Sequence, residues 1–235
     1  MSEPSFPPLM SGLAVEGAID PFEKAGAMAA LGCDAGLIVH NITANQLLAA
    51  IVLVPEVPLE EAMAMLPACG IGFQNALGAL APPEVAVHLE WAGGLRVNGA
   101  SCGRLRVAAG GTDPGAEPGW LVVGLDLPLM QITDSPGDRP DQTALYDEGC
   151  AEVDPVGLLE AWARHTLVWI NRFEEGGAKA LHAEWRGLAH GIGEAITLDG
   201  CHGTYLGVDE RFGLLLRDGD TTHLIPLSTR LETPQ

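Results

Sequence analysis

Three arginines lie close together in the middle of a strongly acidic chain. The 235 residues include 12 Lys and Arg against 31 Asp and Glu, which gives a formal charge of -19 at pH 7. Arg104 and Arg106 are two residues apart, so on a strand they share one face, and Arg96 precedes them. Because a guanidinium group binds phosphate or carboxylate through paired hydrogen bonds, this cluster indicates an anion site. The alternative is a solvated strand face, or pairing of the arginines with Glu84 and Glu90 across a sheet.

Other reactive side chains are sparse or isolated. Lysine occurs only at positions 24 and 179, both in segments with a helical pattern. Five scattered cysteines without a Cys-x-x-Cys pair indicate reduced, mostly buried thiols. A transfer reaction through Cys102 needs a general base, and His88 serves only if the strand register brings the two together. The sequence contains no His-Glu-x-x-His motif and no Walker lysine.

Two tight turns position the arginine cluster. In Val85–Trp91 apolar residues alternate with other residues, as in a half-buried strand. Gly93-Gly94 then supplies a turn, Leu95–Val97 a short return strand, and Asn98-Gly99 the strongest two-residue hairpin signal. The chain is therefore expected to double back twice, with the arginine pair on the third strand.

This pair of hairpins resembles the centre of the biotin and lipoate protein ligases. In that family a strand ending Lys-Trp-Pro-Asn-Asp turns through Asn-Gly into a strand whose lysine contacts the acyl-adenylate. Trp91 matches the tryptophan, and Asn98-Gly99 matches the turn. Glu90 stands where the family has the first lysine, Ala92–Gly94 where it has Pro-Asn-Asp, and Ser101 falls at the second lysine in an ungapped alignment. The two turns and the tryptophan thus match the family, whereas the charged residues do not.

A further departure follows the first helix. A helix capped by Asp20, with Pro21 at its first position, and a strand over Ala35–His40 resemble the opening of the family's catalytic domain. In biotin ligases an Arg- and Gly-rich loop then closes over biotin and the adenylate and shields the anhydride from water. Here Asn41–Gln46 contains no Arg, Lys or Gly before the apolar strand Leu47–Val54. A site without this lid exposes an activated intermediate to water.

The remaining segments follow the family's order. Gly119–Leu127 resembles a family strand, with Asp126 where the family has Asn, and Pro128–Val153 is a long polar connection. A helix that starts at Asp154-Pro155 and a second helix after it precede the C-terminal part. From Gly191 onward, short strand patterns are interrupted by turns.

These patterns and the resemblance together predict an α+β fold with two domains. Residues 1–189 are expected to form a class II-synthetase-like (biotin/lipoate ligase-like) mixed sheet with helices. Residues 190–235 are expected to form a small C-terminal SH3-like β-barrel, of which Ser228–Leu231 is the last strand. The chain reaches ligase-like sequence so early that no N-terminal winged helix for DNA binding is expected.

The resemblance also implies a ligand site on the central sheet. The family joins a carboxylic acid to AMP and passes the acyl group to a lysine of a carrier domain, and cations must stabilise the negative charge that gathers there. Arg104 is the one candidate catalytic residue, as a replacement for the missing lysine. The residues expected to bind the ligand are Trp91, Gly93, Gly94, Asn98, Ser101, Gly103, Arg104, Arg106, Asn41 and Asp126.

Two functional hypotheses follow. The first is a catalytically weakened or inactive relative that binds a small acyl compound, a nucleotide or a carrier domain. The second is an active biotin or lipoate/octanoate ligase or transferase that acts on a carrier-domain lysine through an acyl-adenylate. ATP with Mg²⁺, and biotin or lipoate, are implied as cofactors and substrates only by the second. An open, positively charged space between the central hairpin and Asn41–Gln46 would be compatible with both.

Composition and the first residues indicate which binding partners and which cellular compartment to expect. A charge of -19 repels phosphate backbones and anionic lipid surfaces, so neither nucleic acid nor membrane is expected as a partner. The opening MSEPSFPPLM lacks the pattern of a signal peptide, and no apolar run is expected to span a bilayer. We therefore expect a cytoplasmic protein with no metal site. The sequence does not decide whether two chains pair through a sheet edge to form a homodimer.

Overall fold

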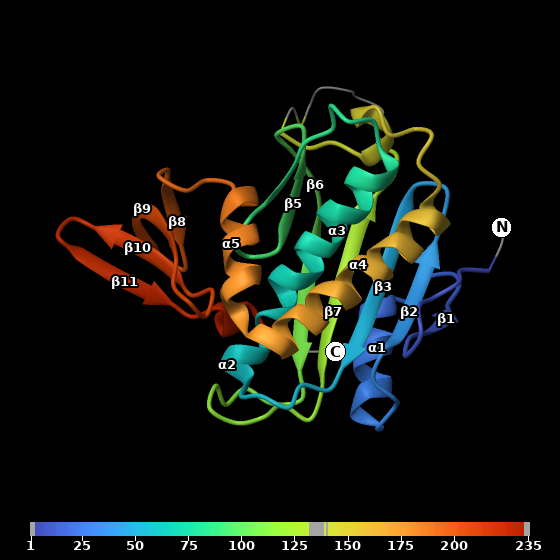
Figure 1. Cartoon of the computed structure of the whole chain (residues 1–235). Helices are drawn as coiled ribbons and strands as arrows, with labels where there is room; N and C mark the ends of the chain where they lie inside the picture. Colours follow the sequence, from blue (N-terminus) through green and yellow to red (C-terminus); the bar gives the residue numbers. More distant parts are fainter. Residues whose placement is uncertain (1–2, 132–138, 140, 233–235) are drawn as a thin grey trace.

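The computed structural model describes residues 3–131, 139 and 141–232, and it shows a large sheet with a smaller one beside it (Figure 1). The large sheet has seven strands in the order β1-β2-β3-β7-β6-β5-β4. Strand β1 is parallel to β2 and the other neighbouring pairs are antiparallel, so the predicted mixed sheet is confirmed. The strands are β1 (Ser11–Ala14), β2 (Leu37–Ile42), β3 (Gln46–Leu53), β4 (Val87–Leu89), β5 (Gly94–Val97), β6 (Ala100–Ala109) and β7 (Leu121–Pro128).

Helices cover both faces of this sheet, because alternate residues of its buried strands point to opposite sides. Along β2, Ile38 packs in the core that includes α3 and α4, whereas Val39 packs in the core that includes α1. Figure 1 shows α3 and α4 crossing in front of the sheet, with α5 beside them. The helices are α1 (Pro21–Ala30), α2 (Leu59–Ala62), α3 (Met65–Leu80), α4 (Pro155–Gly176) and α5 (Ala178–Leu188).

Helices α3 and α4 meet at a glycine. A Cβ added to Gly72 would lie 2.4 Å from Thr166 Oγ1 and 3.0 Å from the backbone N of Thr166. Two tryptophans of α4 flank this contact: Trp162 Nε1 donates a hydrogen bond to the Cys69 carbonyl at 3.1 Å, and Trp169 Nε1 donates one to Asn75 Oδ1 at 2.9 Å. The missing side chain thus lets the two helices approach closely enough for both indole hydrogen bonds.

The same helical region is long and apolar. Leu59–Leu80, which comprises α2 and α3, has the length of a membrane span, and an 18-residue window of it has a mean hydropathy of 1.2. Our expectation that no apolar run is long enough to span a bilayer was therefore wrong. Within the protein, 72% of that window is buried. The apolar character of α2 and α3 therefore fits their burial in the core of this fold.

The predicted double hairpin is confirmed. Asn98 and Gly99 have φ angles of 50° and 91°, the left-handed pair that a two-residue hairpin turn of type I′ requires. At the preceding turn Gly93 has a φ of 97°, and a Cβ there would lie 2.7 Å from the Leu105 carbonyl oxygen. The Leu105 amide donates a hydrogen bond to the Gly93 carbonyl at 2.7 Å, so this turn packs directly against β6.

The C-terminal part is a small antiparallel β unit, as predicted, but it is not a closed barrel. Its sheet has the order β11-β10-β9-β8. The predicted strand Ser228–Leu231 was wrong, because Leu227–Arg230 forms a 3-10 helix after Pro226. The boundary expected after residue 189 falls between α5 and β8 and stays a prediction. The strands are β8 (Ala195–Leu198), β9 (Cys201–Val208), β10 (Leu214–Asp218) and β11 (Thr221–Ile225).

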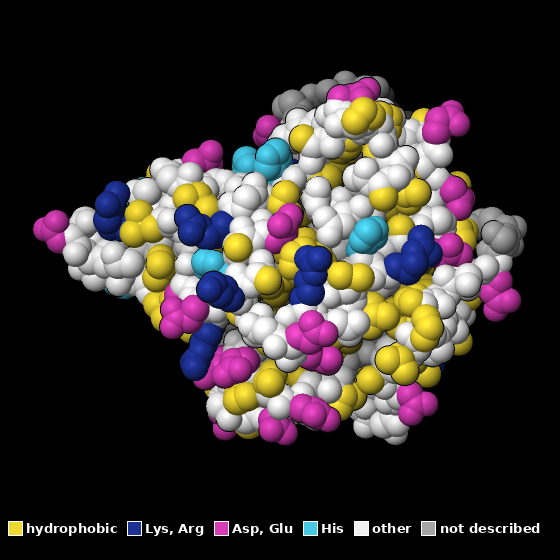
Figure 2. Space-filling model, viewed as in Figure 1, with side chains coloured by type: hydrophobic (Ala, Val, Ile, Leu, Met, Phe, Trp, Pro, Cys, Tyr) yellow, Lys and Arg dark blue, Asp and Glu magenta, His cyan; other side chains and the backbone are white. Residues whose placement is uncertain are grey.

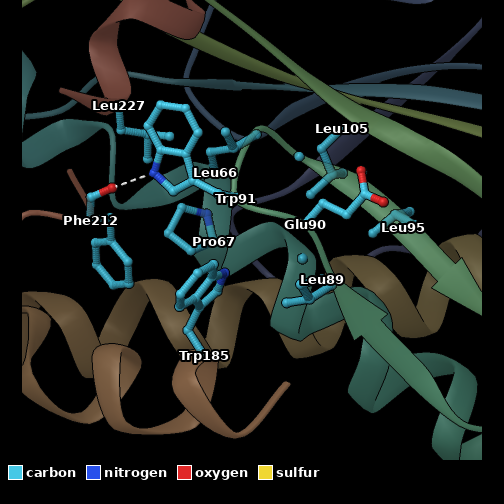
Figure 3. Close-up of a pocket in the computed structure, with 13 residues that line it drawn as sticks. Leu66, Pro67, Leu89, Glu90, Trp91, Leu95, Leu105, Trp185, Phe212 and Leu227 are labelled. Carbon is cyan, nitrogen blue, oxygen red and sulfur yellow. Dashed lines mark hydrogen bonds between the residues drawn. The ribbon is translucent and has the colours of Figure 1, made fainter. Parts of the chain in front are cut away.

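Apolar side chains join the C-terminal unit to the large sheet. Figure 3 shows Trp91 between Leu227, Pro67 and Phe212, with Trp185 of α5 below, and the indole of Trp91 donates a hydrogen bond to the Phe212 carbonyl at 2.7 Å. Trp91 is 7% exposed and Phe212 is 1% exposed. The space among these side chains is about 10 Å³, so this junction is filled by protein.

The predicted long connection after β7 carries a short 3-10 helix at Leu145–Glu148. Part of it runs beside β6: the Ser101 amide donates a hydrogen bond to the Asp141 carbonyl at 2.9 Å, and the Thr143 amide donates one to the Ser101 carbonyl at 2.9 Å. Residues 132–138 and 140 of this connection lie outside the described part of the chain.

Candidate functional site

The face of the large sheet that carries α1 has a hollow of about 340 Å³, which we call the first hollow. It opens between the start of α1, the β2–β3 turn, and strands β6 and β7. Its polar and charged side chains are those of Asp20, Asn41, Thr43, Gln46, Arg104, Arg106 and Asp126. The space between the central hairpin and the Asn41–Gln46 segment is therefore open.

A second hollow of about 540 Å³ lies on the other side of Arg104 and Asp126, which line both. These two residues are direct register partners on β6 and β7, and Arg104 Nε is 3.7 Å from Asp126 Oδ2. The second hollow is further lined by Glu90, Ser101, Gly103, Gln142, Thr143 and Glu232. One Arg–Asp pair thus separates two neighbouring spaces on the same sheet.

The Arg106 guanidinium is held by three carboxylates. Nη1 donates a hydrogen bond to Asp20 at 2.8 Å, Nη2 donates one to Glu23 at 3.2 Å, and Nε donates one to Glu232 at 2.8 Å. Its Cζ also lies 4.1 Å from the ring centroid of Phe22. Burial alone would lower the pKa of Arg106, but hydrogen bonds to Glu232 and Asp20 raise that pKa above its ordinary value. Arg106 therefore stays protonated, and the three carboxylates around it balance its positive charge.

Arg104 is far less constrained. Its side chain is 59% exposed, and the carboxylate of Asp126 at 3.7 Å is its ion-pair partner. That carboxylate also accepts a hydrogen bond from Gln46 Nε2 at 2.8 Å. Arg104 is thus the cation of the two hollows that is best placed to meet a ligand.

The two arginines of β6 share a face, as predicted, whereas Arg96 is engaged elsewhere. Arg96 Nε donates a hydrogen bond to Glu90 at 2.6 Å, and Nη1 donates one to the Gly99 carbonyl at 2.6 Å. The pairing with Glu90 across the sheet is therefore correct for Arg96. The hollows contain acidic groups as well as cations, so the space between the central hairpin and Asn41–Gln46 is open and carries charges of both signs.

Seven of the ten predicted ligand residues line the two hollows, and their role in binding stays a prediction. Trp91 and Gly93 lie in the filled junction instead. Asn98 holds the hairpin: its Oδ1 accepts a hydrogen bond from the Ala86 amide at 3.0 Å, and its Nδ2 donates one to Glu148 at 2.9 Å. Gly103 has a φ of 115°, and a Cβ there would lie 2.5 Å from the Asp126 carbonyl oxygen. The residues brought together are Asn41, Gly94, Ser101, Gly103, Arg104, Arg106 and Asp126.

Sequence reasoning missed the carboxylates that surround Arg106. Asp20 was predicted only as a helix cap, and it does accept a hydrogen bond from the Phe22 amide at 2.8 Å through Oδ1, which leaves Oδ2 for Arg106. Glu23 follows three residues later on the same helix. Glu232 comes from the far end of the chain, and nothing in its local sequence indicated this contact.

Cys102 is buried on the other side of the sheet. Strand alternation would place it beside Arg104, but it belongs to the core that contains Leu105 and Val107. Gly103, with its left-handed backbone, interrupts the alternation. His88 pairs with Arg96 on β5, the strand between β4 and β6, so the register does not bring His88 to Cys102. The hypothesis of Cys102-dependent transfer with His88 as base was wrong in its geometry.

The cysteines are expected to differ sharply in reactivity, because the thiolate is the reactive form. Burial, together with nearby Glu148, raises the pKa of Cys102 to about 12, whereas Cys201 is exposed. At pH 8 in the native protein, we expect Cys201 to react with iodoacetamide at least ~100-fold faster than Cys102. Peptide mass mapping of the labelled protein measures both rates, and unfolded protein, in which all five react, is the control. Equal native rates would contradict the burial of Cys102.

Charges on the opposite face are dispersed. Figure 2 shows the side covered by α3, α4 and α5, where Lys and Arg side chains stand apart from one another, over α4, α5 and the C-terminal unit. Asp and Glu side chains lie between and around them. The arginine pair of β6 is thus a local feature of the hollowed face.

Comparison with known proteins places this geometry in a family. The model of the "Biotin/lipoate A/B protein ligase family" matches residues 6–187. The chain belongs to this family. A second model, a domain of unknown function (DUF4444), matches residues 192–233, which cover the C-terminal unit. No curated protein matches the chain.

Solved structures agree with this family membership. A biotin protein ligase-like protein of unknown function from Silicibacter sp. TM1040 is 63% identical, with a TM-score of 0.94, over 98% of this chain and 100% of that one. Biotin protein ligase from Aquifex aeolicus is 16% identical, with a TM-score of 0.73, over 96% of this chain and 97% of that one. The Leishmania major biotin protein ligase in complex with biotinyl-5-AMP is 14% identical, with a TM-score of 0.56, over 93% and 98%. The last two show that the fold is shared.

Proposed function

We propose that this protein is a family member that binds a small acyl compound in the first hollow and no longer makes an acyl-adenylate. The main support for this proposal is that the positive charge of Arg106 is already paired with three carboxylates. Adenylate formation gathers negative charge, and preorganised cations must stabilise it. With Arg106 held by Asp20, Glu23 and Glu232, the hollows offer Arg104 and little else to a phosphate.

The turn between β2 and β3 supports the same proposal. Strands β2 and β3 are joined by Thr43, Ala44 and Asn45 alone, and Thr43 Oγ1 donates a hydrogen bond to Asn45 Oδ1 at 3.0 Å. Three residues are too short to fold over a ligand in the adjoining hollow. An activated anhydride there would stay open to hydrolysis.

Calorimetric titration with biotin, lipoate, octanoate and ATP tests the proposal. We expect one of the acyl acids to bind and ATP to give no heat of binding. We expect Arg104→Gln to weaken acyl binding by at least ~10-fold, since a hydrogen bond to a charged group contributes roughly 1.5–3 kcal/mol. Arg164→Gln is the matched control, because Arg164 has a similarly exposed side chain on α4 and a single ion-pair partner. Mass spectrometric detection of acyl-AMP after incubation with ATP, Mg²⁺ and the acids would contradict the proposal.

A second function, an active ligase or transferase acting on a biotinyl or lipoyl carrier domain, is favoured by the exposure of Arg104. Its guanidinium is exposed in an open hollow, where it is accessible to take over the cationic role of the missing lysine. An acyl-transfer assay on such a carrier domain, with Arg104→Ala as comparison, tests it. Transfer by the parent that falls at least ~100-fold in the variant supports this function, and no transfer by the parent rules it out. A cytoplasmic location and a homodimer stay predictions.

A further inference from the structure

The last described residues of the C-terminal unit return to the large sheet. After the 3-10 helix, the Glu232 amide donates a hydrogen bond to the Val107 carbonyl of β6 at 2.8 Å. The Arg230 guanidinium lies 5.6 Å from the ring centroid of Trp91, and Leu227 is 3% exposed in the junction. The junction thus fixes the path of this segment and sets where the Glu232 side chain lies.

The Glu232 carboxylate contacts two nitrogens of the Arg106 guanidinium. Glu232 Oε2 accepts a hydrogen bond from Arg106 Nε at 2.8 Å and is 2.7 Å from Nη2. Arg106 lines the first hollow and Glu232 lines the second. A carboxylate held in this way occupies two guanidinium nitrogens that would otherwise meet a carboxylate or phosphate of a ligand.

Glu232 also changes the charge of the second hollow. Among the described residues, three carboxylates line it, those of Glu90, Asp126 and Glu232, against one guanidinium, that of Arg104. Glu90 is paired with Arg96, and Asp126 with Arg104. Replacing Glu232 by a neutral residue would therefore lower the negative charge of the second hollow and would also free two hydrogen-bond donors of the Arg106 guanidinium.

We propose that Glu232, supplied by the C-terminal unit, is the charge-selectivity residue of the two hollows. With Arg106 occupied, Arg104 is left as the exposed cation, and the added negative charge of Glu232 repels a phosphate dianion more strongly than an acyl compound with one negative charge or none. This inference rests on the proposed function in taking the hollows as the ligand site. It gives the C-terminal unit a direct part in ligand choice.

The experiment compares AMP binding by the parent, Glu232→Gln, Glu232→Asp and Glu210→Gln, by calorimetry in low salt. Glu210 is exposed in the turn between β9 and β10 of the same unit, so its variant controls for the loss of one charge from the chain. We expect Glu232→Gln to bind AMP at least ~10-fold more tightly than the parent, and Glu232→Asp and Glu210→Gln to resemble the parent. The gain should shrink at ~1 M salt, where the Debye length falls to about 3 Å.

Equal AMP affinity in the parent and Glu232→Gln, or an equal gain in Glu232→Asp, would overturn the proposal. So would a gain that is insensitive to salt, because a purely structural change does not depend on screening. Thermal unfolding of each variant checks its fold, and the 37% exposure of the Glu232 side chain favours folded variants. Acyl binding by the parent is measured separately. A parent that binds no acyl acid, with a Gln variant that gains AMP binding, refutes the proposed function and leaves the role of Glu232 standing.

Discussion

Gly72→Ala is expected to destabilise the protein by about 3 kcal/mol, the upper end of the usual cost of overpacking. The new Cβ would lie 2.4 Å from Thr166 Oγ1 and 3.0 Å from Thr166 backbone atoms, so α3 and α4 must move apart. That movement also lengthens the indole hydrogen bonds of Trp162 and Trp169. Urea unfolding followed by circular dichroism measures the change in free energy.

Gly78→Ala is the matched control in the same helix. A Cβ at Gly78 meets nothing closer than Gln74 Nε2 at 3.8 Å. The variant should therefore gain helix propensity and become more stable by about 0.5–1 kcal/mol. If Gly72→Ala were no less stable than Gly78→Ala, the close crossing of α3 and α4 at Gly72 would be refuted.

Trp91→Ala is expected to cost about 3–5 kcal/mol, as for other buried tryptophans. It removes the ring that fills the junction and the hydrogen bond to the Phe212 carbonyl. We expect the C-terminal unit to loosen first, because Trp91 is its anchor on the large sheet. Limited proteolysis with mass mapping should show new cleavage after α5, at the start of the small β unit.

Trp91→Phe separates the two contributions. It keeps an aromatic ring but leaves the buried Phe212 carbonyl without its indole donor, which costs about 1–3 kcal/mol. We expect its unfolding free energy to fall between those of the parent and Trp91→Ala. A phenylalanine variant as stable as the parent would show that the indole hydrogen bond contributes nothing.

Local signals made the central part of the fold predictable. Asn98-Gly99 fixes a two-residue turn through backbone angles that few other residues adopt, and Asp20 and Asp154 each cap the helix that follows them. Alternation also placed Arg104 and Arg106 on one face. These features depend on residues near in sequence, where steric and hydrogen-bonding preferences act directly.

The pairing of charged residues in the site could not be predicted from such local signals. The pairing of Arg106 with Glu232 joins residues 126 positions apart and depends on the path of the whole C-terminal unit. The burial of Cys102 depends on one glycine that reverses the facing of the strand. The small β unit was predicted from its turns, but whether its sheet closes depends on pairing between strands, which turn spacing does not specify.

The hydrogen bond from Glu232 to Val107 has a consequence for how the molecule matures. Synthesis proceeds from the N-terminus, so the strands of the large sheet leave the ribosome before Glu232 does. During that interval Arg106 has only the two carboxylates of α1 beside it, and the nascent sheet is more cationic than the finished one. The electrostatic character of the hollowed face is therefore complete only when the segment after the small β unit has docked on β6.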